Sequence, residues 1–387
     1  MQVLVEGLLV LSRRPRSSGW TGRSWRVLFQ KDHSLPKRLT CISKKIKPCQ
    51  YSENFQESNL ALLIILTDLS PEFSRNPGME LDLDWALSVQ ANTSAIERRC
   101  QALPGRRSIK KANQAAWLLK AITCIDLTTL SGDDTEERVR RLCQKAKFPV
   151  RKDILEVLEI EPSTISTGAI CVYHDMVKAA VSALEGTMIP VAAVSTGFPA
   201  GLSPYSLRLA EIGESVKDGA KEIDIVISRR HVLSQDWQAL YDEMKAFREA
   251  CGEAHVKAIL ATGELGTLRN VARASLICMM AGADFIKTST GKESVNATLP
   301  VSLTMIRQIR DYYDRTGYHV GYKPAGGISK AKDALTYLAL MKEELGERWL
   351  QPDLFRFGAS SLLGDIERQL EHFVSGHYSA SYRHAMG

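Results

Sequence analysis

Apolar and polar positions follow two alternating patterns from residue 121 toward the C-terminus. Short runs rich in apolar and β-branched residues have the length of buried strands, and eight are predicted: Ala121–Ile125, Gly168–Val172, Pro190–Val194, Glu222–Ile227, His255–Leu260, Phe285–Lys287, Gly321–Lys323 and Leu354–Phe357. Between them, apolar residues recur at helical spacing and predict helices at Thr135–Lys147, Asp175–Glu185, Ser206–Asp218, Trp237–Ala250, Leu268–Met280, Ser302–Thr316 and Lys330–Leu345. This alternation predicts an α/β fold, the parallel closed (β/α)8 TIM barrel. An open doubly wound sheet is the alternative, although no G-x-G-x-x-G follows the first strand.

The N-terminal part of the chain has a different character. Residues 71–78 form a Pro, Ser, Asn and Gly cluster that is typical of a domain boundary, and helical patterns follow at Leu81–Val89 and Gln114–Lys120. We therefore expect residues 79–387 to form the barrel domain with a helical lead-in. Residues 1–78 are expected to be an extension that is disordered or not part of the barrel. A mitochondrial targeting segment is the alternative interpretation, because residues 1–50 are rich in Arg and Ser.

The distribution of charge and cysteine limits the classes of partner. Residues 1–78 hold 12 of the 50 Lys and Arg residues and 6 of the 44 Asp and Glu residues, which leaves 38 of each sign for the rest. A neutral body argues against nucleic acid as the partner, since binding to phosphate backbones needs a basic face. The eight cysteines include no C-x-x-C pair, which predicts a reduced, cytoplasmic setting and no zinc or other metal site. The apolar run Leu60–Leu66 is far shorter than the roughly 20 residues that cross a membrane.

Lys287 lies at the end of an apolar segment and before a loop of small residues. Because side chains alternate along a strand, Lys287 shares a face with Phe285, while Ile286 takes the other face. A lysine in this position either pairs with a carboxylate, extends its ammonium to water, or has a lowered pKa that makes the amine a nucleophile. The segment alone favours a structural lysine, and its neighbours in the predicted barrel favour the nucleophile.

Four more charged residues occupy inward positions of predicted strands or follow a strand end: Asp126, Asp224, Lys257 and Lys323. Ile223, Ile225 and Ile227 alternate with Asp224, so that Asp224 points into the barrel. The carboxyl ends of barrel strands converge on one mouth, where these residues would meet Lys287. A structural ion-pair network is the alternative, but three lysines beside two aspartates are better suited to shifting pKa values.

Glycine and hydroxyl residues follow the last three predicted strands: Thr290-Gly291-Lys292, Gly326-Gly327 and Gly358-Ala359-Ser360-Ser361. Backbone N–H groups in glycine-rich turns and at helix N-termini bind phosphate, and barrels often use the last two loops for this purpose. A single turn of this kind is weak evidence. Three turns at neighbouring strand ends predict an anion site.

Four motifs resemble those of the 2-deoxyribose-5-phosphate aldolase family: residues 124–130 (CIDLTTL), 285–292 (FIKTSTGK), 323–327 (KPAGG) and 357–361 (FGASS). They occur in order at the expected strand ends, and the resemblance extends from about residue 80 to residue 369. It implies that Lys287 forms the Schiff base, Lys323 tunes its pKa, and Asp224 transfers protons. In the mechanism that we expect from these residues, Lys257 and Asp126 position the reacting groups. The resemblance also implies that the glycine loops and Ser360 hold the substrate phosphate.

The activity implied by this resemblance is that of a class I aldolase that needs no cofactor. It would reversibly split 2-deoxy-D-ribose 5-phosphate into D-glyceraldehyde 3-phosphate and acetaldehyde, in deoxyribose phosphate catabolism. The expected partner is therefore a small phosphosugar, with neither nucleic acid nor membrane, and a homo-oligomer is left open. Two alternatives remain: a phosphosugar isomerase that works by acid–base chemistry without an imine, and a non-catalytic protein that retains the fold.

Overall fold

The predicted TIM barrel is confirmed in the computed structural model, which describes residues 75–106 and 108–384. The eight parallel strands are β1 (Ile125–Thr128), β2 (Ala169–Tyr173), β3 (Val191–Ser195), β4 (Glu222–Val226), β5 (His255–Ile259), β6 (Phe285–Lys287), β7 (Gly321–Lys323) and β8 (Phe357–Ala359). Pairing runs in chain order from β1 to β7, and β8 pairs with β1. Two isolated parallel bridges, Tyr322 to Phe355 and Ala325 to Gly358, link the β7 and β8 segments and close the barrel.

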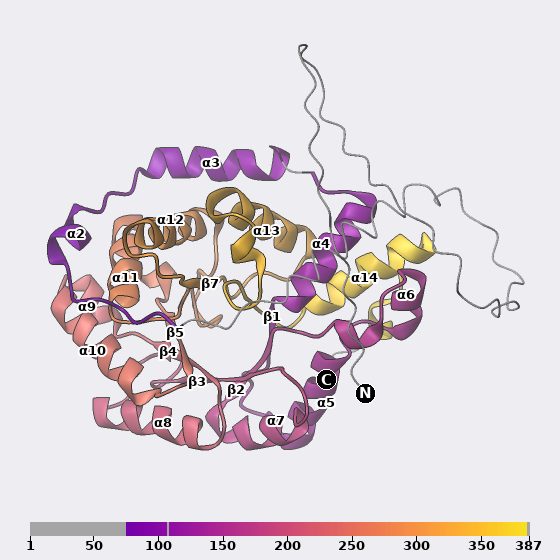
Figure 1. Cartoon of the computed structure of the whole chain (residues 1–387), viewed down its shortest axis with the longest axis horizontal. Coiled ribbons are helices and arrows are strands. Elements are labelled where there is room, and N and C mark those ends of the chain that lie inside the picture. Colours follow the sequence, from indigo (N-terminus) through magenta and orange to yellow (C-terminus); the bar gives the residue numbers. More distant parts are fainter. Residues whose placement is uncertain (1–74, 107, 385–387) are drawn as a thin grey trace, which may run out of the picture. The chain divides into compact units, whose positions relative to one another are not determined.

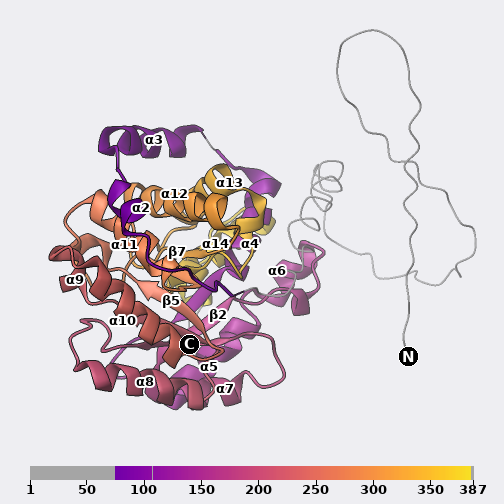
Figure 2. The same ribbon diagram turned by 60° about the vertical axis from the view of Figure 1, so that its left-hand side comes forward.

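Helices surround the strands on all sides of the barrel (Figures 1 and 2). The α-helices are α2 (Leu83–Ser88), α3 (Thr93–Arg106), α4 (Lys111–Thr123), α5 (Glu136–Lys147), α6 (Lys152–Val157), α7 (Val177–Ala183), α8 (Tyr205–Lys217), α9 (Arg229–Leu233), α10 (Trp237–Ala250), α11 (Leu268–Met280), α12 (Leu299–Thr316), α13 (Ala331–Leu345) and α14 (Leu362–Ser375). Helix α3 lies across the outer side of α12 and α13 in both views. The ring between barrel and solvent is therefore built from the α-helices that alternate with the strands.

Local sequence signals explain where several of these helices begin. The side chains of Thr135, Asp236, Thr267 and Thr298 each accept a hydrogen bond from a backbone N–H in the first turn of α5, α10, α11 and α12, respectively. Such caps satisfy amide groups that have no partner inside the helix. Helix α12 ends at Gly317, which has φ of 75° and adopts the left-handed conformation that glycine tolerates best. These caps fix where the loops at the barrel ends start and stop.

Two predicted strand boundaries were wrong. The segment Ala121–Ile125 is mostly the buried end of α4, and β1 begins only at Ile125. A short apolar run has the same composition in a buried helix end as in a strand, so periodicity could not separate them. The segment Leu354–Phe357 is mostly irregular, and β8 starts at its last residue and continues to Ala359. The predictions also lacked α3, the short helices α6 and α9, and the helix after the last strand, α14.

The segment at the start of the described region lies against the N-terminal end of β6. The N–H of Asn76 donates to Asp284 Oδ1 at 2.9 Å, and its side-chain amide donates to the carbonyls of Met279 and Ala283. Residues 1–74 lie outside the described residues, so the boundary at residue 78, the disordered extension and the targeting alternative stay predictions.

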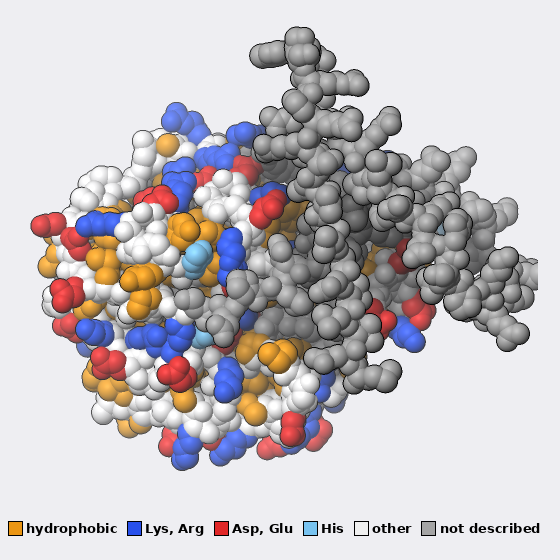
Figure 3. Space-filling model, in the orientation of Figure 1, with side chains coloured by type: hydrophobic (Ala, Val, Ile, Leu, Met, Phe, Trp, Pro, Cys, Tyr) orange, Lys and Arg blue, Asp and Glu red, His pale blue; other side chains and the backbone are white. Residues whose placement is uncertain are grey.

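The surface of the described region carries both signs of charge. Figure 3 shows Lys and Arg side chains interspersed with Asp and Glu over the visible face. No helix within residues 75–106 and 108–384 has the length and apolar content that a membrane crossing requires.

Candidate active site

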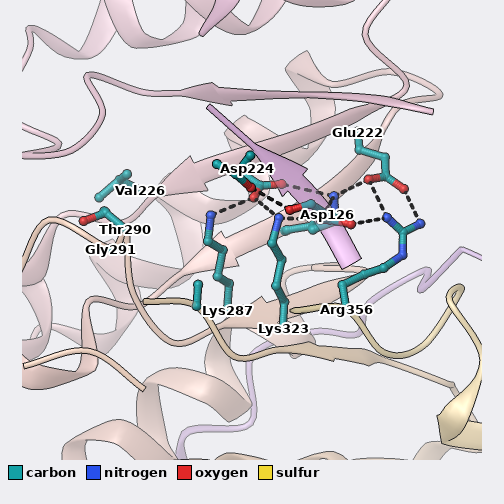
Figure 4. A network of polar contacts seen from close by, with 12 residues as sticks. Asp126, Glu222, Asp224, Val226, Lys287, Thr290, Gly291, Lys323 and Arg356 are labelled. Carbon is teal, nitrogen blue, oxygen red and sulfur yellow. Dashed lines mark hydrogen bonds and ion pairs between the residues drawn. The ribbon is translucent and has the colours of Figure 1, made fainter. Parts of the chain in front are cut away.

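Lys287 and Lys323 lie side by side in the barrel and point at the same carboxylate (Figure 4). They are direct partners in the register of β6 and β7. The Nζ atom of Lys287 lies 2.8 Å from Asp224 Oδ2, and that of Lys323 lies 2.7 Å from the same oxygen. All three residues are buried, and Lys287 is only 3% exposed. The sequence pattern placed these side chains correctly inside the barrel.

Close packing of β6 on β7 supports this arrangement. Phe285 pairs with Gly321 in the register, and a Cβ atom at residue 321 would lie 2.4 Å from the Phe285 ring. Only glycine therefore leaves room for the ring inside the barrel at this level. The Phe285 ring also lies 5.9 Å from the ammonium of Lys257, which is the neighbouring interior residue on β5.

Lys257 and Asp126 complete the set of five charged residues that the sequence pointed to. Lys257 Nζ lies 3.1 Å from Asp224 Oδ1 and 3.7 Å from Asp126 Oδ2. Asp126 also accepts a hydrogen bond from Lys323. The structure therefore brings all five residues together, and their chemical roles stay predictions.

Two further charged residues join the network and were missed at the sequence level. Glu222, at the start of β4, binds Lys257 and Arg356, with Arg356 Nη2 at 2.8 Å from Glu222 Oε1. Arg356, just before β8, also lies 2.5 Å from Asp126 Oδ1 through Nη1. Alternation contained a signal for both, because Glu222 shares a strand face with Asp224 and Arg356 stands between Phe355 and Phe357.

The network separates the two central lysines electrostatically. Burial lowers the pKa of Lys287, and the charge of Lys323 acts in the same direction against the opposing effect of Asp224. Burial also disfavours the charged form of Lys323, but Asp126 and Asp224 outweigh it and raise the pKa of Lys323. Burial alone would raise the pKa of Asp224, yet the surrounding lysines hold it well below its ordinary value. The arrangement thus favours a neutral amine at Lys287 and a charged one at Lys323.

An apolar wall inside the barrel stands beside this network. It is formed by Cys171, Ala192, Val194, Phe198, Val226 and Ile259, with Leu130 and Tyr173 packed against it. Ile259 is the register partner of Lys287 on the neighbouring strand. Apolar neighbours remove water from the amine, which is the physical origin of the lowered pKa of Lys287.

In the predicted phosphate loop after β6, several hydrogen-bond donors are already bound to a side chain of the same loop. The N–H groups of Thr290 and Gly291 both donate to the carboxylate of Glu293, at 3.0 and 3.2 Å, and so does the Thr290 hydroxyl. Lys292 extends away from the loop and donates to the Leu130 carbonyl at 3.1 Å. An incoming anion at Thr290 and Gly291 would therefore compete with an internal carboxylate.

The loops after β7 and β8 lie next to each other and offer free donors. The backbone N–H groups of Gly326, Gly327 and Ser360 donate to no other residue of the described chain. Ser361 stands at the N-cap of α14, where amides without a partner inside the helix favour an anion. Gly358 differs, because its N–H donates to the Pro324 carbonyl at 2.9 Å.

A cavity of about 370 Å³ opens over the loops that follow β3, β4, β5 and β6. Its lining includes Arg229, Lys292 and Glu293, with Thr290 at the side of the predicted phosphate loop. Lys287 does not line it. No group of His, Cys, Asp and Glu side chains in the described part of the chain could hold a metal ion.

Comparisons with known proteins identify the family of the chain. The sequence model of the DeoC/LacD family of aldolases matches residues 120–365. The deoxyribose-phosphate aldolase of Mus musculus is 61% identical over 305 residues, which are 78% of this chain and 96% of the mouse protein. That of Homo sapiens is 59% identical over 309 residues, 79% of this chain and 97% of the human protein. A tetrameric deoxyribose phosphate aldolase from Aeropyrum pernix shares the fold, with a TM-score of 0.51 and 22% identity over 72% of this chain and 99% of its own. The resemblance inferred from the four motifs is thereby confirmed, and the chain belongs to the DeoC/LacD family of aldolases.

Proposed function

We propose that this enzyme cleaves 2-deoxy-D-ribose 5-phosphate reversibly through an imine on Lys287. The observation that carries the proposal is the position of the Lys287 amine, which is buried and bound to a single carboxylate oxygen that it shares with Lys323. A free lysine is only about 0.04% neutral at pH 7, so burial beside a second cation greatly increases the nucleophilic form.

The first step is attack of the Lys287 amine on the C1 carbonyl of the open-chain sugar. Loss of water gives the protonated imine, which accepts electrons when the bond between C2 and C3 breaks. The C3 hydroxyl loses its proton as the C3 aldehyde forms, and D-glyceraldehyde 3-phosphate leaves. The remaining enamine takes up a proton at C2, and hydrolysis of the imine then releases acetaldehyde and the free lysine.

Asp224 and Lys323 are placed to handle these protons. The lowered pKa of Asp224 keeps it ionised, so that it accepts a hydrogen bond from the C3 hydroxyl directly or through a water. Lys323 stays protonated, holds Asp224 in position and keeps positive charge beside Lys287. Lys257 and Asp126 anchor this pair from the other side.

The substrate phosphate would bind where the loops after β7 and β8 meet. Gly326, Gly327 and Ser360 supply free N–H groups there, and the N-terminus of α14 adds a favourable dipole. Lys292 can turn from the Leu130 carbonyl toward the phosphate. Thr290 and Gly291 would contribute once Glu293 releases them.

The proposal extends to a biological setting. The reaction removes deoxyribose 5-phosphate, which fits a role in deoxynucleoside catabolism in the cytoplasm. The Aeropyrum relative is tetrameric, so a homo-oligomer is part of the proposal.

The test is reduction with borohydride in the presence of deoxyribose 5-phosphate, followed by peptide mapping. We expect turnover to acetaldehyde and glyceraldehyde 3-phosphate, and a substrate-dependent mass increase on the peptide that contains Lys287. The Lys287→Arg variant keeps the charge but supplies no neutral amine, and it should show neither. A label on Lys323 would reverse the assigned roles, and turnover without any label would indicate chemistry without an imine.

A further inference from the structure

The lysines and the arginine of the network do not share the carboxylates equally. Lys257 lies within ion-pair distance of Asp126, Glu222 and Asp224. Lys323 contacts the two aspartates, and Arg356 contacts Asp126 and Glu222. Among the described residues, Lys287 forms an ion pair with Asp224 alone. Of these four bases, Lys287 therefore has the fewest carboxylate partners.

The numbers of opposite charges also differ. The described side chains joined by these contacts include four bases, Lys257, Lys287, Lys323 and Arg356, and three carboxylates, Asp126, Glu222 and Asp224. Cys171 on β2 adds no charge, because burial raises the pKa of its thiol. In a buried network each unbalanced charge is costly. The free energy of the network is therefore lower when one of the four bases is neutral.

Arg356 is built into the inner end of the network. It is 4% exposed, and its guanidinium forms two contacts with Glu222 and one with Asp126. A Cβ atom at Gly168, just before β2, would lie 3.2 Å from Arg356 Cδ and 2.8 Å from the Thr123 carbonyl oxygen. The missing side chain at residue 168 thus makes room for the arginine.

Arginine stays charged under all ordinary conditions, so Arg356 cannot be the neutral base. Arg356 binds Glu222 Oε1 and Asp126 Oδ1 and shares Glu222 Oε2 with Lys257, which leaves Asp126 Oδ2 and the two oxygens of Asp224 to the three lysines. We propose that Glu222 and Arg356 are positioning residues that make Lys287 the neutral base of the network. The inference rests on the proposed imine at Lys287 and names the residues that prepare it, although neither touches the substrate-binding amine.

This role predicts opposite effects from the two halves of one ion pair. Arg356→Gln removes a positive charge, which should raise the pKa of Lys287 and move the rate profile toward alkaline pH. Glu222→Gln removes a negative charge and should move the profile toward acid pH. The double variant has the same charge surplus as the wild type and should return the profile close to its original position. Each single shift should be about one pH unit, as expected for a unit charge acting over roughly 10 Å at an effective dielectric constant of about 20.

The experiment measures the pH dependence of imine trapping with acetaldehyde and cyanoborohydride in the full-length protein. Acetaldehyde carries no phosphate, so the readout does not depend on the phosphate site. Lys145→Met is the matched control. It removes the cation on α5 that pairs with the buried Glu367 of α14, and it should change stability without moving the profile. Thermal unfolding of each variant identifies those that fold.

The outcomes separate this inference from the proposed function. Opposite shifts in the single variants and recovery in the double variant would support the inference. Shifts in the same direction, or unchanged profiles with Lys287 still labelled, would overturn it while leaving the imine mechanism intact. Absence of a label on Lys287 in the wild type would instead defeat the proposed function. If Arg356→Gln does not fold, an acid shift in Glu222→Gln still supports the inference, and its absence rejects it.

Discussion

Lys287 and Lys323 share one acceptor, since both Nζ atoms bind Asp224 Oδ2, at 2.8 and 2.7 Å. The two lysines also stand opposite each other in the ladder of β6 and β7, so the backbone itself fixes their separation. Asp126 forms an ion pair with Lys323 but does not contact Lys287. Because of this difference in partners, the two aspartates raise the pKa of Lys323, while burial lowers the pKa of Lys287.

The first prediction concerns the charge of Lys323. In Lys323→Met the pKa of Lys287 should rise toward its ordinary value, because the neighbouring cation is gone. We expect kcat at pH 7 to fall by roughly a hundredfold or more and to recover partly at pH 9, which a pH series measures directly. Lys120→Met, which removes a buried lysine bound to Gln351 outside the network, is the control and should keep the wild-type profile. A low kcat with no alkaline recovery would mean that Lys323 acts by other means.

The second prediction concerns stability. The pKa of Lys287 is lower in the folded protein than in the unfolded chain, so the unfolded chain binds more protons over the window between those values. Wild-type stability should therefore rise with pH through that window, by about 1.4 kcal/mol for each unit of pKa difference. Lys287→Met removes this dependence, while Asp224 keeps Lys257 and Lys323 as partners.

We expect Lys287→Met to be inactive yet at least as stable as the wild type at pH 7, with the difference shrinking by pH 9. Urea denaturation at both pH values measures it. A variant that is clearly less stable at pH 7 would show that the Lys287 contact with Asp224 stabilises the fold more than burial of the amine destabilises it.

The alternation of residues was enough to predict the barrel and the inward direction of Asp224, Lys257 and Lys287. It failed at residues 121–123 because a buried helix end and a strand have the same apolar composition. It also failed to identify the pair of Glu222 and Arg356, although both lie on inward faces. The two residues are 134 positions apart, and their contact depends on the closure of the barrel, which no local pattern encodes.

The sequence of the loop after β6 contains a signal for a hydrogen bond within the loop itself. Thr290 and Glu293 have the T-x-x-E spacing of a capping box, in which the carboxylate returns to the N–H of the first residue. The structure shows this contact at 3.0 Å. Glycine content alone suggested an open anion site, but the availability of its donors depends on which neighbouring side chain reaches them.

The third prediction tests the proposed phosphate position. Ser360→Asp places a carboxylate beside the free donors of the β7 and β8 loops, where it would repel a phosphate and compete for the same N–H groups. We expect KM for deoxyribose 5-phosphate to rise roughly tenfold or more, with little change for unphosphorylated deoxyribose. Ser182→Asp, at an exposed position on α7, adds the same charge elsewhere and should leave both values unchanged. Equal losses on both sugars would place the phosphate elsewhere.

The last prediction asks why residue 358 is glycine. Its N–H already donates to Pro324, so it has no free donor for a phosphate, whereas a Cβ atom there would lie 2.7 Å from Ala325 Cβ and 3.2 Å from Lys323 Cε. Gly358→Ala should therefore push Lys323 from its place, at a cost of about 1–3 kcal/mol in stability. We expect kcat to fall and its pH profile to move toward alkaline pH, with KM for the phosphorylated sugar little changed.

Gly213→Ala is the matched control, because residue 213 is exposed in α8 and nothing lies within 4 Å of the added atom. This substitution should add about 0.5–1 kcal/mol of stability without altering the kinetics. A rise in KM with an unmoved pH profile would show instead that Gly358 serves the phosphate and not the lysine.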